Sequence, residues 1–75
     1  MPTISTPQQL GALLANRRSH LKLTQSELGE KIGLSQNRLS VLERNPAALT
    51  ARQLLTLLQA LGLEMTLAER AGHKT

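Results

Sequence analysis

The most informative segment of the sequence is LTQSELGEKIGLSQNRLSVLER, residues 23–44. Thr24 opens it with a T-x-x-E capping box, the signature of a helix N-terminus. Gly33 can take the left-handed conformation that ends a helix, and Ser35 can cap the next one. A second helix of similar length then follows over residues 36–44. Two short helices joined by a glycine turn have the spacing of a helix-turn-helix.

Two further helices are predicted outside this segment. A T-x-x-Q capping box starts the first at Thr6, and this helix ends near residues 19–20. A loop over residues 45–50 follows the third helix, because proline disfavours helix at and before its own position. Another T-x-x-Q box opens the fourth helix at Thr50, and Gly62 closes it. The apolar positions expected to face inward in the first three helices are Leu10, Leu13, Leu14, Leu21, Leu28, Ile32, Leu39 and Leu42, and the fourth helix carries Leu54, Leu55, Leu57, Leu58 and Leu61.

The composition fits one small, mainly α-helical domain spanning residues 1–75, with the helix-turn-helix at about residues 24–44. Of the residues, 40% are hydrophobic but none is aromatic, so the core must be aliphatic. The leucines of the fourth helix cover an arc of about 160°, wider than one packing face needs. A chain this short buries little surface alone, so we expect a homodimer.

The residues after Gly62 change from helical to alternating periodicity. Leu63, Met65 and Leu67 alternate with less apolar residues, which predicts one strand over about residues 63–68, followed by a tail over residues 70–75. A lone strand leaves its backbone unpaired, so we expect it to pair across the dimer. The residues predicted at the dimer interface are Leu58, Leu61, Leu63, Met65 and Leu67.

Several functional classes are disfavoured by what the chain lacks. It has no Cys, no Asp, no Tyr and no glycine-rich phosphate loop, and its two histidines, His20 and His73, are far apart. We therefore predict neither an enzyme nor a metal site, and no cofactor. The absence of aromatic residues argues against a stacking-based RNA or single-strand binder. With no long apolar run and no signal-peptide pattern, we expect no membrane association and a cytoplasmic protein.

The outward face of the third helix carries groups that can read base edges. With Leu39 and Leu42 facing inward, helical periodicity places Asn37, Ser40, Val41 and Arg44 on the opposite side and Gln36 beside them. Gln and Asn can bind adenine, Ser is adaptable, and valine can contact a thymine methyl group. A plain solvated helix would more often carry Lys and Glu. This face predicts binding to double-stranded DNA.

Basic residues gather around the same segment. The formal net charge is +4, and residues 17–44 hold six of the nine basic residues and three of the five glutamates, leaving +3 of it. Such an excess favours a polyanionic partner. The residues predicted to contact DNA phosphates are Gln25, Arg38, Arg44 and Asn45.

Glu43 borders the buried side of its helix, where a carboxylate needs a partner. Either Arg17 or Arg18 of the first helix can supply it, and periodicity alone does not choose between them. We expect a structural ion pair here.

Taken together, these residues resemble the Xre/Cro-type helix-turn-helix family of lambda-repressor-like domains, whose recurring core reads TQSELGEKIGLSQ in this chain. Residues 4–67 further resemble the HipB-type antitoxins, through STPQQL, ERNP, LQAL and the closing MTL. The resemblance implies major-groove reading by Ser35, Gln36, Asn37 and Ser40, a phosphate contact from Gln25, and an ion pair of Arg18 with Glu43.

The resemblance also implies a function. It points to a homodimeric antitoxin that binds a palindromic operator, represses its own operon and neutralises a HipA-like serine/threonine kinase toxin. Operator binding would place it on the nucleoid. The alternative is a stand-alone or phage-type repressor with no toxin partner. A protein-interaction module that does not read DNA is a third class, which the polar face of the third helix disfavours.

Overall fold

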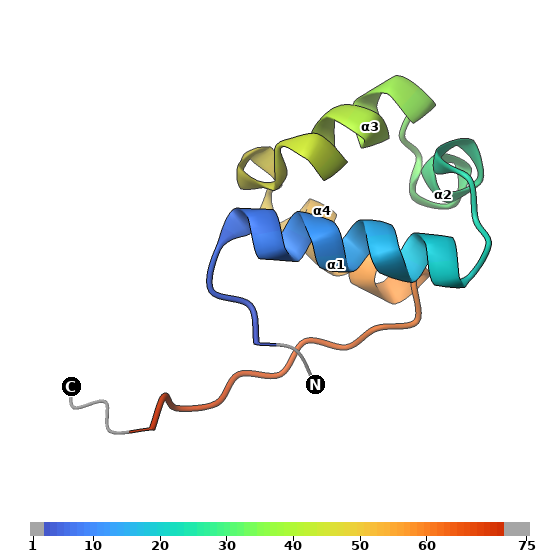
Figure 1. Ribbon diagram of the computed structural model, residues 1–75. Coiled ribbons are helices and arrows are strands. Elements are labelled where there is room, and N and C mark those ends of the chain that lie inside the picture. Colours follow the sequence, from blue (N-terminus) through green and yellow to red (C-terminus); the bar gives the residue numbers. More distant parts are fainter. Residues whose placement is uncertain (1–2, 72–75) are drawn as a thin grey trace.

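The computed structural model describes residues 3–71. Within them four α-helices and one short 3-10 helix surround a single core (Figure 1). Their order is α1 (Pro7–His20), α2 (Gln25–Ile32), α3 (Gln36–Arg44), η1 (Pro46–Ala48) and α4 (Ala51–Ala60). α1 packs on α3, and α2 packs on both α3 and α4. The mainly helical fold expected from the sequence is confirmed.

All four α-helices begin at the residue that the sequence predicts. Thr6, Thr24 and Thr50 each accept a backbone hydrogen bond from the residue three positions later, whose own side chain bonds back to the cap. These are complete capping boxes, which satisfy donors left free by the first turn. Ser35 caps α3 through its hydroxyl oxygen, which accepts from the backbone N–H of Arg38 at 3.1 Å.

Three of the helices end in the same hydrogen-bonded turn. After α1, α2 and α4, the amide of a leucine bonds back to a carbonyl five residues earlier, and that leucine packs on the core or is half-buried. The preceding residue has a positive φ, 75° at Gly33 and 69° at Gly62. At the end of α1 the same position is Lys22, with φ of 59°. A side chain therefore occupies a conformation that usually favours glycine.

The core consists of leucines from all four α-helices. Leu14, Leu28, Leu39, Leu42, Leu57, Leu58 and Leu61 are buried. The prediction for Leu21 was wrong, because α1 ends one residue earlier and the Leu21 side chain is 38% exposed. Gly11 lies instead where α1 approaches η1. A Cβ atom there would collide with the ring of Pro46, so the glycine permits this close packing.

Two segments differ from the sequence-based expectation. The loop predicted after α3 contains η1, and Pro46 at its start is buried. Residues 63–70 form no strand in the single chain. Leu63 still packs on the core, and the residues that follow it run away from the helices (Figure 1). A strand exists only when its backbone is paired, so the predicted strand over residues 63–68 still depends on a second copy. His73 and most of the predicted tail lie outside the described residues.

Candidate nucleic-acid interface

The turn between α2 and α3 fixes how these two helices cross. The Leu34 amide donates to the carbonyl of Gly29 at 2.8 Å, which folds the chain back over the end of α2. A Cβ atom on Gly29 would collide with the Leu34 carbonyl, so glycine permits the close approach. Leu39 and Leu42 pack into the core, so the side of α3 that carries them faces inward. The opposite side of α3 is left facing solvent.

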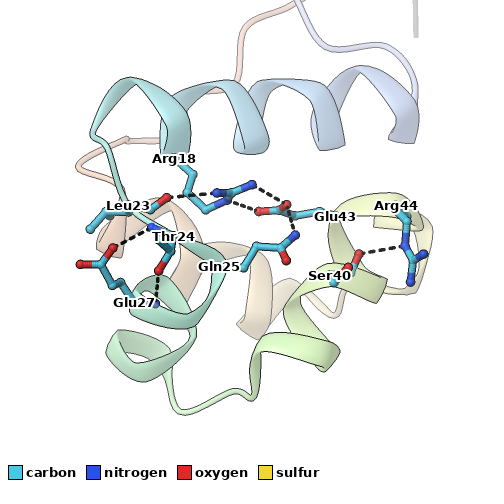
Figure 2. Close-up of polar contacts among 8 residues, drawn as sticks. All are labelled: Arg18, Leu23, Thr24, Gln25, Glu27, Ser40, Glu43 and Arg44. Atoms are coloured by element: carbon cyan, nitrogen blue, oxygen red, sulfur yellow. Dashed lines mark hydrogen bonds and ion pairs between the residues drawn. The ribbon is translucent and has the colours of Figure 1, made fainter.

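That outer side carries most of the residues expected to contact DNA. Gln36, Asn37, Arg38 and Arg44 are exposed, and Asn45 follows at the end of the helix, also exposed. Val41 is 40% exposed. Ser40 is half-buried, and its backbone carbonyl accepts a hydrogen bond from Arg44 Nε at 3.4 Å (Figure 2). Ser35 sits at the start of the same helix, where its hydroxyl oxygen serves as the cap.

A polar network behind this face ties α1, α2 and α3 together (Figure 2). Arg18 donates to both carboxylate oxygens of Glu43, from Nε at 2.7 Å and from one terminal nitrogen at 3.1 Å. Its other terminal nitrogen donates to the Leu23 carbonyl at 3.0 Å. The side chains of Arg18 and Glu43 are only 18% and 9% exposed. Such a bidentate pair, shielded from water, fixes the position of α3 against α1.

Gln25 is the third member of this network. Its amide nitrogen donates to Glu43 Oε1 at 3.0 Å, so the carboxylate accepts three hydrogen bonds in all. The sequence predicts Gln25 as a free phosphate contact, and this contact with Glu43 was missed. One amide N–H of the side chain remains for another acceptor. Any phosphate contact of Gln25 is therefore made by a side chain already held in place.

Arg17 has a different role from its neighbour. Its Nε donates to the carbonyl of Leu61 at 2.9 Å, so it caps the C-terminal end of α4. The two candidates that periodicity left open are thus separated: Arg18 pairs with Glu43, and Arg17 holds α4. No local signal marks this role, because the carbonyl it meets lies 44 residues further along the chain.

The carboxylate of Glu27 is stabilised in its ionised form by its neighbours at the start of α2. Hydrogen bonds to its carboxylate from the Thr24 backbone N–H and the Thr24 side chain hold its pKa below the ordinary value of 4.5, and nearby Lys31 adds to this effect. The carboxylate is therefore ionised throughout the neutral range. Its negative charge lies in the first turn of α2, where the helix dipole favours an anion.

The residues predicted at a dimer interface fall into two groups. Leu58 and Leu61 are 6% and 0% exposed within the single chain, so their assignment to the interface is corrected: they belong to the chain's own core. Leu63 is half-buried against that core. Met65 and Leu67 are 45% and 91% exposed and remain available to a second copy. Leu55 of α4, 55% exposed, is the surplus leucine that the fold leaves uncovered.

Within residues 3–71, no group of three His, Cys, Asp or Glu side chains could hold a metal ion. No helix in that range is long and apolar enough to cross a bilayer.

The crossing of α2 and α3 and the exposed polar side of α3 define a helix-turn-helix domain. In agreement, residues 13–68 match the family described as Helix-turn-helix. The chain is similar to Antitoxin HipB of Escherichia coli strain K12, with 39% identity over 66 residues that cover 88% of this chain and 75% of the antitoxin. It is also similar to Antitoxin HipB of Escherichia coli O6:H1 strain CFT073, with 38% identity over 88% of this chain and 70% of that protein.

Solved structures give the same result. The fold is similar to HipB in a HipB–O1–O2 complex, with a TM-score of 0.84 and 38% identity over 92% of this chain and 100% of that one. A HipA–HipB–O2–O3 complex contains a chain that matches with the same score and identity, covering 92% of this chain and 97% of that one. The chain therefore belongs to the HipB-type antitoxins of the helix-turn-helix family, and the resemblance seen in the sequence is confirmed.

Proposed function

We propose that this chain is a DNA-binding antitoxin that represses its own operon and neutralises a HipA-like serine/threonine kinase toxin. It acts as a regulator and not as an enzyme. Binding of a palindromic operator by a homodimer would place two copies of α3 in successive major grooves. This activity belongs in the cytoplasm, on the nucleoid.

The observation that carries the proposal is the solvent-facing side of α3. Gln36 and Asn37 offer amides that can bind adenine, and the hydroxyl of Ser40 can serve either as donor or acceptor. These side chains stand on a helix whose position is fixed from behind by the pair of Arg18 and Glu43. Because the helix that carries the base-contacting side chains is already held in place, little conformational entropy is lost when it binds DNA.

Phosphate contacts would come from the cations and amides that flank this side: Gln25, Arg38, Arg44 and Asn45. These contacts position the domain on the duplex without selecting its sequence. Arg18 is not among them, because its charge is already paired with Glu43.

The partners are inferred from the relatives. HipB chains 38% identical to this one were solved with operator DNA and together with HipA. Their shared fold and the extent of the match support the same two partners for this chain. The operator sequence itself does not transfer, because base-reading side chains can differ between related domains.

Two measurements on the full chain test the proposal. Selection from a random duplex pool should enrich one sequence, and affinity for it should fall steeply with rising salt. Co-expression with the kinase encoded in the same operon should yield a complex and restore cell growth. DNA enrichment without a kinase complex would indicate the stand-alone repressor. A kinase complex without sequence preference would indicate a protein-interaction module.

A further inference from the structure

The guanidinium of Arg17 lies where the C-terminal segment leaves the core. Its Nε donates to the Leu61 carbonyl at 2.9 Å, and a Cβ atom added to Gly62 would lie 3.5 Å from one of its terminal nitrogens. The last turn of α4 has no basic residue of its own, so Arg17 supplies the cation that the helix dipole favours there. Among residues 3–71 the Arg17 side chain makes this one hydrogen bond, so both terminal nitrogens can donate to a further acceptor.

Pairing of the C-terminal segment with a second copy has one register that suits its apolar residues. Two antiparallel copies related by a two-fold axis can be centred on Met65, which then lies opposite its own copy. Leu63 then lies opposite Leu67 of the partner subunit, so each apolar side chain of the segment meets another apolar side chain. A centre between Met65 and Thr66 would instead set these two residues opposite one another, apolar against polar.

The register centred on Met65 also brings a carboxylate to Arg17. Glu69 lies as many residues after Met65 as Leu61 lies before it, so Glu69 of the partner subunit comes level with Leu61. Leu63 packs on the core, and alternate residues of a strand share a face, so Glu69 points to the side on which the helices lie. Opposed residues have Cβ atoms about 4.5–5.5 Å apart, within reach of an arginine side chain.

We propose that Arg17 forms an ion pair with Glu69 of the partner subunit and that this pair fixes the register of the two segments. The proposal rests on the homodimer proposed above and names the residues that align it. The apolar residues alone do not fix the register, because sliding by two residues keeps every side chain on its face. That slide would move Glu69 of the partner subunit about 7 Å along the strand from Arg17.

Single cysteines test the register, because the chain has no cysteine of its own. With the pairing centred on Met65, Met65→Cys should form a disulfide between two copies under mild oxidation, since opposed Cα atoms lie within the distance that a disulfide spans. Thr66→Cys is the matched control and should stay reduced, because its two copies are diagonal and not opposed. Non-reducing gel electrophoresis gives the linked fraction. Faster linking of Thr66→Cys than of Met65→Cys would overturn the register and the ion pair with it.

A cycle of variants tests the ion pair itself. Sedimentation equilibrium of the full chain gives the dimer dissociation constant for wild type, Arg17→Gln, Glu69→Gln and the double variant. Glu69→Gln should weaken the wild-type dimer about fivefold, because two symmetric exposed pairs are lost. It should change nothing in the Arg17→Gln background. The amide nitrogen of Arg17→Gln takes the place of arginine Nε along the side chain, so it can still donate to the Leu61 carbonyl.

Glu64→Gln is the matched control for charge. It removes the same charge from the same exposed segment, but Glu64 lies on the opposite face of the strand from Glu69. The dimer dissociation constant should therefore stay at the wild-type value. Rising salt should weaken the wild-type dimer more than the Glu69→Gln dimer, because salt screens an exposed ion pair.

Two results of the cycle would overturn the inference. One is an equal effect of Glu69→Gln with and without Arg17, and the other is an equal effect of Glu64→Gln and Glu69→Gln. A wild type that stays monomeric at every concentration would reject the homodimer and the ion pair together. The operator and kinase assays do not depend on this pair, so its failure is distinguishable from failure of the proposed function.

Discussion

Glu43 is the residue at which three helices are held to one another. Its carboxylate accepts from Arg18 of α1 and Gln25 of α2 while it stands on α3. Helical periodicity was enough to predict that this carboxylate needs a partner. It could not select Arg18 over Arg17, because adjacent arginines on one helix can both reach across. That choice depends on α4, whose end engages Arg17.

Replacing Glu43 by alanine should therefore destabilise the domain strongly. The change leaves the guanidinium of Arg18 shielded and unpaired, which costs about 3 kcal/mol, the lower end for buried pairs because this one is partly exposed. The free energy of unfolding from urea titrations followed by circular dichroism is the measurement. The double variant Arg18→Ala, Glu43→Ala, compared with both single variants, should recover part of the loss. Additive losses would show that the two side chains do not interact.

Glu27 should make the stability of the domain depend on pH in a defined direction. Its pKa is lowered by folding, so its contribution is present above the ordinary value of 4.5 and is lost as pH falls through the lower folded value. In Glu27→Gln, the amide oxygen can still accept the Thr24 bond but does not titrate. Wild type should therefore lose more thermal stability than this variant between about pH 5 and pH 3. If the melting temperatures of the two proteins fell by the same amount over this pH range, Glu27 would not be the source of the pH dependence.

Helix starts were predictable because capping is local. Each threonine or serine cap and its partner three residues later lie within one turn, so the sequence contains the whole interaction. η1 was missed because Pro46 is held by contact with Gly11, far away along the chain. The positive φ of Lys22 was also missed, since lysine gives no signal for this conformation. The end of α1 is set by tertiary packing of the leucine that follows.

Lys22→Gly should stabilise the domain. The left-handed conformation costs a residue with a Cβ atom about 1 kcal/mol, and the greater freedom of glycine in the unfolded chain offsets part of the gain. We expect a net increase of about 0.5 kcal/mol in the free energy of unfolding. Gly62→Ala is the matched reverse change, because an added Cβ would meet only a terminal nitrogen of Arg17, at an ordinary van der Waals distance of 3.5 Å, and the backbone conformation is the main cost. It should destabilise the domain, and an unchanged value for both variants would reject this account.

The molecule as a whole leaves apolar surface for a second copy, but not where leucine density alone predicts it. Helical periodicity predicts the direction in which the side chains of Leu58 and Leu61 point from α4. It does not predict which other helices pack against them. The other helices cover both side chains completely or nearly so. Among residues 3–71, the most exposed large apolar side chains are Leu55, Met65 and Leu67. Pairing of two chains cannot be deduced from one chain's pattern, so the dimer stays a prediction.

Met65→Pro tests this dimer. Proline removes a backbone donor from the paired strands, so the variant should be a monomer of reduced stability. Met65→Ala keeps the donor and should remain dimeric at high concentration. Light scattering across a dilution series gives the mass of each. A dimer of unchanged affinity in the proline variant would exclude strand pairing through this segment.

Residues that contact base edges and residues that contact phosphates should affect DNA affinity differently. Gln36→Ala should cost about 1 to 3 kcal/mol on the selected operator and almost nothing on random DNA. Arg44→Ala should weaken binding to both duplexes alike and reduce the salt slope by about one unit. Fluorescence anisotropy of labelled duplexes across a salt series measures both effects. Equal weakening of both duplexes by Gln36→Ala would mean that α3 does not read the sequence.

The segment after α4 also affects how quickly proteases can degrade the chain. Residues 64–70 are exposed and form no strand in the single chain, and the Leu67 side chain is 91% exposed. Exposed backbone of this kind is where proteolytic cleavage concentrates. A second copy that paired with the segment would remove it from attack. The lifetime of the chain would then rise with its own concentration, so that dilution during growth would speed its degradation.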